Sequence, residues 1–176
     1  MHTTTSSRAP RFRLSPRARK SVVALHIVTS VGWLGITAAN LVLLLSGLST
    51  ADPTRQHAAF TAMAMVGETL LIPVSLLTFA SGLVLSLATK WGLFRHWWVA
   101  IKFVLTLIAV VLTPLSSVPG LGELAAAVSA APSGQLIDTS AYAGGLLSAG
   151  FVSSGMYLTC VLMTAFKPGG RIRKRR

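Results

Sequence analysis

The chain has 176 residues, of which 52% are hydrophobic and 11% are charged. Soluble domains are about 45–50% apolar and about 25% charged, so this composition excludes an ordinary soluble domain. The formal net charge is +12, and a single cysteine, Cys160, excludes an internal disulfide. These quantities indicate a basic membrane protein.

Four stretches are long and apolar enough to cross a membrane as helices, because a hydrocarbon core of about 30 Å needs about 20 apolar residues. The expected spans are residues 21–49, 58–89, 97–118 and 142–166. Each is expected to be helical, since an unpaired strand leaves its backbone groups unsatisfied in lipid. The sequence therefore predicts an all-α, integral membrane four-helix bundle.

The segments outside the spans are polar or basic. Residues 1–20 form a basic tail that we expect to be disordered, and residues 167–176 form a second basic tail. Residues 119–141 are expected to form an outer loop, in which the run GELAAAVSAA favours a short helix lying on the outer surface. We find no second domain.

The basic residues predict the orientation of the chain. Fourteen of the sixteen Lys and Arg residues lie before the first span, between the second and third spans, or after the fourth, and Arg55 alone lies in the opposite loops. By the positive-inside rule we expect both termini to be cytoplasmic. This bias explains the net charge without nucleic acid as a partner, and we expect the tails to contact anionic lipid headgroups.

Three of the spans contain one ionisable residue each: His26, Glu68 and Lys102. Such groups are costly at membrane depth and usually face a bundle interior or a functional site. Lys102 has two interpretations, a side chain that reaches toward cytoplasmic headgroups or a cationic site for an anion together with His26. Glu68 is expected to be either a buried, hydrogen-bonded acid or a proton relay.

The polar residues of the first and third spans recur at helical spacing. Each set is expected to lie along one helix face and to face protein. The first span contributes His26, Thr29, Ser30, Trp33, Thr37 and Asn40, and the third contributes Lys102, Thr106, Ala109 and Thr113. In the fourth span, small residues four apart favour packing in the bundle or dimerisation.

A second imidazole is the usual requirement for a b-type haem, and His26 and His96 are the two histidines in or next to a span that are expected on one side of the membrane. The runs Leu25-His26 and Gly32-Trp33-Leu34-Gly35, with the segment from Trp91 through His96 to Lys102-Phe103, resemble a group of uncharacterised bacterial four-span membrane proteins. More distantly, this pattern is similar to the CopD-like and HemJ-type membrane proteins.

That resemblance implies copper-related transport or haem-linked protoporphyrinogen oxidation. His26 is then implied as an axial ligand or proton carrier, and Lys102 as the residue that holds a propionate. The chain departs from the pattern near the end of the third span, where such proteins often carry a histidine and residues 110–114 are Val-Val-Leu-Thr-Pro.

Two functions remain open from the sequence. The first is haem or porphyrin binding through His26, with Lys102, His96 and Trp33 around the cofactor. The second is a membrane transport or accessory subunit, in which Glu68 and Asn40 are buried polar residues or part of a proton relay. In either case the partner is expected to be a second copy of the chain or another membrane subunit.

Overall fold

The computed structural model describes residues 14–88, 92–132, 134–170 and 172. Most of the expected N-terminal tail, Trp91, the last residue of the expected second span and most of the C-terminal basic run lie outside the described residues. The elements are α1 (Pro16–Ser49), α2 (Pro53–Ala88), α3 (Trp97–Leu112), a π-helical turn η1 (Thr113–Ser117), α4 (Val118–Ala130) and α5 (Ser140–Phe166).

The described part of the chain contains four long helices, because α3, η1 and α4 form one helical rod of 34 residues. All four are apolar and long enough to cross a membrane. The predicted all-α class and the four spanning-type helices are therefore confirmed. At 1.5 Å per residue, the 36 residues of α2 extend about 54 Å, which is well beyond a hydrocarbon core of about 30 Å.

The third long helix differs from the expected one. Residues 119–130, which were expected to lie in an outer loop, continue the helix as α4. Pro114 has no backbone N–H and its ring crowds the preceding turn, so an ordinary α-helix is broken there. The π-helical turn accommodates it: the Val118 N–H donates to the Thr113 carbonyl, five residues back. The helix therefore passes the proline instead of ending.

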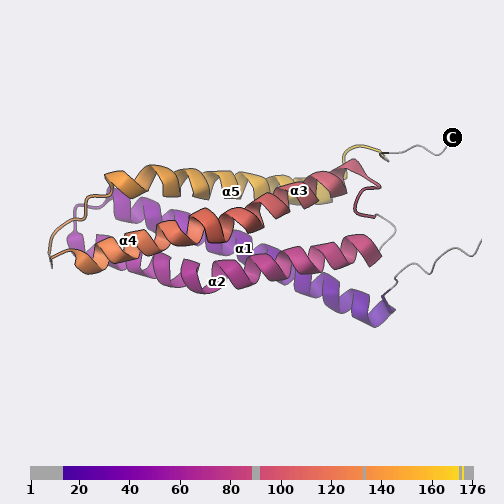
Figure 1. Cartoon of the computed structure of the whole chain (residues 1–176), viewed down its shortest axis with the longest axis horizontal. Helices are drawn as coiled ribbons and strands as arrows, with labels where there is room; N and C mark the ends of the chain where they lie inside the picture. The colour runs from indigo at the N-terminus through magenta and orange to yellow at the C-terminus, as the bar shows by residue number, and fades with distance from the viewer. Residues whose placement is uncertain (1–13, 89–91, 133, 171, 173–176) are drawn as a thin grey trace, which may run out of the picture.

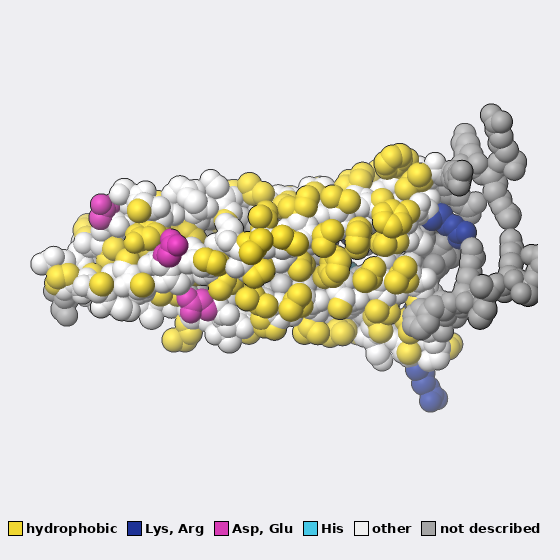
Figure 2. Space-filling model, viewed as in Figure 1, with side chains coloured by type: hydrophobic (Ala, Val, Ile, Leu, Met, Phe, Trp, Pro, Cys, Tyr) yellow, Lys and Arg dark blue, Asp and Glu magenta, His cyan; other side chains and the backbone are white. Residues whose placement is uncertain are grey.

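The four long helices run up and down in one elongated bundle (Figure 1). We call the end that holds the start of α1 and the end of α5 the terminal end, and the opposite end the far end. α1 packs chiefly against α2, while α5 lies against α1 and the α3–α4 rod. On the face in Figure 2, hydrophobic side chains gather toward the terminal end and acidic side chains toward the far end.

Glycine allows the closest contacts between helices. A β-carbon on Gly47 of α1 would overlap the ring of Phe60 on α2, which is fully buried. A β-carbon on Gly67 would likewise overlap Leu121 of α4. These two glycines let α2 approach both α1 and α4, and the buried core lies between these helices.

One buried amide side chain fastens the far end of the bundle. Gln56 is 5% exposed, and its Oε1 accepts a hydrogen bond of 2.7 Å from the Ile137 N–H in the loop before α5. Its Nε2 donates to the Gly47 carbonyl at 3.4 Å. Beside it, His57 Nε2 donates to the Gln135 carbonyl at 3.0 Å. The start of α2 therefore holds both α1 and the α4–α5 loop.

The Gly47 contact predicts a matched pair of variants in α1. Gly47→Ala should lower the free energy of unfolding by about 1–3 kcal/mol, because the added methyl group meets the buried Phe60 ring. Gly35→Ala is the control, since nothing lies within 4 Å of its added methyl group. Thermal unfolding in detergent measures both. Equal midpoints for the two variants would contradict the close approach.

Candidate functional site

The polar helix faces predicted for α1 and α3 both turn toward the interior. Thr29, Trp33 and Thr37 of α1 are buried, as are Ala109 and Thr113 on the α3–α4 rod. α5 adds a third polar face that the sequence reasoning missed. It consists of Ser153, Tyr157, Cys160 and Thr164, whose spacing of four, three and four residues places them on one side of the helix.

One group of polar side chains between the helices surrounds His26. Its Nδ1 lies 3.1 Å from the Thr78 carbonyl oxygen and 3.0 Å from the Ser81 hydroxyl, both on α2. A carbonyl oxygen only accepts, so Nδ1 carries the proton and Nε2 is left as an acceptor. A β-carbon on Gly82 would lie 2.9 Å from His26 Cε1, so this glycine gives the imidazole its place against α2.

Lys102 connects α3 to α5 in the same region. Its ammonium group donates to the Thr164 hydroxyl at 2.5 Å, and that hydroxyl donates to the Cys160 carbonyl. Lys102 also lies within electrostatic range of both His26 and the Cys160 thiol. We call His26, Ser81, Lys102, Cys160 and Thr164 the His26 cluster.

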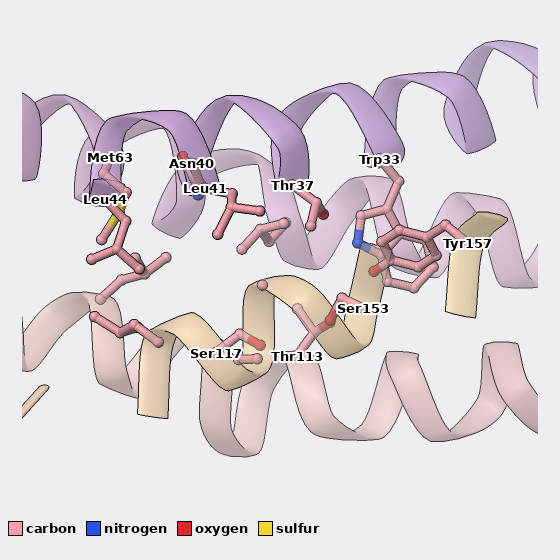
Figure 3. Close-up of a pocket in the computed structure, with 15 residues that line it drawn as sticks. Trp33, Thr37, Asn40, Leu41, Leu44, Met63, Thr113, Ser117, Ser153 and Tyr157 are labelled. Atoms are coloured by element: carbon pink, nitrogen blue, oxygen red, sulfur yellow. The ribbon is translucent and has the colours of Figure 1, made fainter. Parts of the chain in front are cut away.

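A cavity of about 60 Å³ lies farther from the terminal end, where the four long helices meet (Figure 3). We call it the central cavity. None of its lining side chains is charged, and five carry hydroxyl groups. The lining residues are Trp33, Thr37, Asn40, Leu41, Leu44, Met63, Leu71, Thr113, Ser117, Leu121, Leu146, Ala149, Gly150, Ser153 and Tyr157.

Two polar atoms of the cavity lining have no hydrogen-bond partner in the protein. They are Trp33 Nε1 and Asn40 Oδ1, and both are buried. Leaving such a group unpaired costs about 1–3 kcal/mol, so a buried donor and a buried acceptor without partners indicate an occupant. The Trp33 ring packs on Tyr157 with centroids 4.7 Å apart, which closes the end of the cavity nearer the His26 cluster.

The π-helical turn contributes directly to the cavity, through Thr113 and Ser117. The Thr113 hydroxyl donates to the Ala109 carbonyl at 2.8 Å, so its oxygen remains able to accept. Single π-turns within α-helices occur frequently at functional sites. Pro114 is the sequence signal for this turn, because a proline inside a helix removes a backbone N–H donor.

The remaining predicted residues are not brought together. Glu68 is exposed, so the expectation that it is buried is wrong. Its carboxylate lies beside Gly122 of α4, because Gly67 and Leu71 take the inward positions next to it on α2. Asn40 is half-buried at the far end of the cavity, and His96 stands at the start of α3.

A b-type haem does not fit these residues. Sites for ligands of drug size enclose about 300–1,000 Å³, whereas the central cavity has about 60 Å³ and no histidine among its lining residues. The His26 ring is instead packed against Gly82 and hydrogen-bonded to α2 through Nδ1. The haem interpretation of His26, Lys102, His96 and Trp33 is therefore unsupported.

Four helices that are long and apolar enough to cross a membrane surround an uncharged cavity. No protein-family model matches the chain, and no curated protein or solved structure is significantly similar to it. The structure of the site itself therefore carries the functional argument.

The contacts of His26 predict a structural role for this residue. His26→Ala should lower the free energy of unfolding by about 1–3 kcal/mol, because it removes the Nδ1 hydrogen bond to α2. His26→Asn should recover part of that loss, since an amide N–H can replace the Nδ1 donor. Thermal unfolding measures both variants. A Soret band in protein from a haem-replete host that disappears in both would contradict this assignment.

Proposed function

We propose that the chain is a multi-pass protein of the bacterial plasma membrane, with both termini in the cytoplasm. The positive-inside bias supports this orientation. The arrangement of the bundle agrees with it, because the start of α1 and the end of α5 lie at one end and the acidic side chains in Figure 2 gather toward the other.

The level of the membrane in this proposal follows from helix geometry. A core of about 30 Å takes up about 20 helical residues, counted from the terminal end of each long helix. The count reaches Ile36, Glu68, Ser117 and Leu146. Two of these, Ser117 and Leu146, line the central cavity, so the cavity lies at the outer boundary of the hydrocarbon core. Glu68 lies at the outer boundary, where an exposed carboxylate meets water.

Within this framework we propose a transport or accessory subunit that binds a small, uncharged polar solute. The observation that carries the proposal is the central cavity, with its uncharged lining and its unpartnered donor and acceptor. Polar side chains continue from it toward the cytoplasmic side, because Tyr157 lies beside Thr37 and Ser153 and within electrostatic range of Cys160.

Lys102 supports an uncharged solute over a proton. A fixed cation beside a narrow path opposes the passage of cations and protons. Lys102 belongs to the His26 cluster, whereas Glu68 is exposed on the outside of the bundle. A proton relay through the Glu68 carboxyl group is therefore not part of this proposal.

The orientation is tested by reporter fusions in a bacterial host. A green fluorescent protein fused to either terminus should fluoresce, and an alkaline phosphatase at the same positions should be inactive, because both ends are cytoplasmic. A phosphatase inserted at Gly134, in the α4–α5 loop, is the positive control and should be active. The opposite pattern would overturn the orientation.

The solute proposal is tested by osmotic swelling of proteoliposomes in urea and in glycerol. We expect swelling severalfold faster than in protein-free liposomes, without a matching rise in proton permeability. Gly150→Val should abolish the difference, because it places a larger side chain in the cavity lining against Leu41. Gly155→Val is the matched control on α5, since nothing lies within 4 Å of that position.

Charge selectivity is measured in the same vesicles with a pH-sensitive dye. Lys102→Met should raise proton permeability, and Glu68→Gln should not change it. If native vesicles swell no faster than protein-free ones for either solute, the transport proposal fails.

A further inference from the structure

The two unpartnered atoms of the central cavity lie at different levels along α1. Trp33 and Asn40 are seven residues apart, which corresponds to about 10 Å along the helix axis. Trp33 Nε1 can only donate a hydrogen bond, whereas the Asn40 amide donates through Nδ2 and accepts through Oδ1. A single occupant that contacts both side chains therefore has to be elongated, with an acceptor at the Trp33 end.

The wall between these two levels consists of groups that can serve either role. The hydroxyls of Thr37, Ser153 and Tyr157 line the cavity from α1 and α5, and those of Thr113 and Ser117 line it from the π-helical turn. A hydroxyl both donates and accepts. An occupant made of hydroxyl groups is thus complementary to the wall and to both ends, while a charged occupant has no partner of opposite sign among the lining residues.

Volume and span agree on the size of that occupant. About 15 Å³ of such a cavity holds one water, so about 60 Å³ holds about four water-sized groups. Hydroxyl oxygens in a hydrogen-bonded row are about 2.8 Å apart, so about three of them bridge a gap of about 10 Å. Both values correspond to a single row of three or four hydroxyl oxygens.

We propose that the central cavity binds a file of three or four hydroxyl groups, held by the Trp33 N–H at one end and by the Asn40 amide group at the other. Two sources supply this chemistry, a row of water molecules and a short linear polyol. The inference deepens the proposed function by naming the class of solute, but it concerns occupancy of the cavity and is independent of any measured flux.

The experiment is water-edited solid-state NMR on the full chain in proteoliposomes, with the tryptophan indoles labelled with ¹⁵N. Trp33→Phe assigns the Trp33 signal. We expect magnetisation to pass from water to the Trp33 indole proton, although this side chain is only 2% exposed. Addition of ¹³C-labelled erythritol distinguishes the sources: a contact between erythritol and the indole identifies a polyol, and an unchanged water contact identifies water.

A matched pair of variants connects the signal to the file. Ser153→Ala removes a hydroxyl from the cavity wall and should weaken the transfer to Trp33. Ser154→Ala should leave it unchanged, because Ser154 lies outside the lining and its hydroxyl donates to the Gly150 carbonyl. A Trp33 indole that contacts neither water nor erythritol overturns the inference. An occupied cavity without solute flux would instead overturn only the transport function.

Discussion

Polar side chains on largely apolar helices have to find their partners on other helices, and this constraint determines how the bundle is assembled. In a hydrocarbon environment an unpaired hydroxyl, amide or ammonium group is costly, so the polar face of each helix turns toward those of its neighbours. The contacts of His26 with α2 and of Lys102 with Thr164 show the result. Each of these two contacts fixes the orientation of a helix about its own axis, so the other polar residues of that face also turn inward.

Close packing along α2 completes this arrangement. Gly47 and Gly67 allow α2 to meet α1 and α4 at short distance, and Gln56 holds the far end together through backbone partners on two segments. The central cavity lies where this tight packing gives way. There α5 meets the π-helical turn, and neither Gly150 nor Ala149 has a side chain large enough to fill the space.

The sequence was sufficient for those features that depend on one helix at a time. Apolar length predicted the four long helices, and helical spacing predicted that the faces of Trp33 and Thr113 turn inward. It failed for Glu68, because an ionisable residue in an apolar span is expected to face the interior, and only the packing of Gly67 and Leu71 shows that these neighbours take the inward positions. The cavity was beyond reach, because it depends on side chains from all four long helices.

The third helix shows the same limit in a different form. A proline near the end of an expected span favours a helix end, yet the π-helical turn at Pro114 lets the helix continue to Ala130. Whether a helix breaks or passes a proline depends on the neighbours available to its displaced backbone and side chains. The Thr113 hydroxyl supplies one such contact, to the Ala109 carbonyl.

α5 differs from the other long helices in having no buried residue, although it supplies five of the residues around the cavity. It also leaves the ribosome after α1, α2 and the α3–α4 rod. During synthesis α1, α2 and the α3–α4 rod therefore exist for a time with the indole of Trp33 and the hydroxyl of Thr113 uncovered. Docking of α5 completes the wall of the central cavity, so the order of biogenesis determines when the cavity first exists.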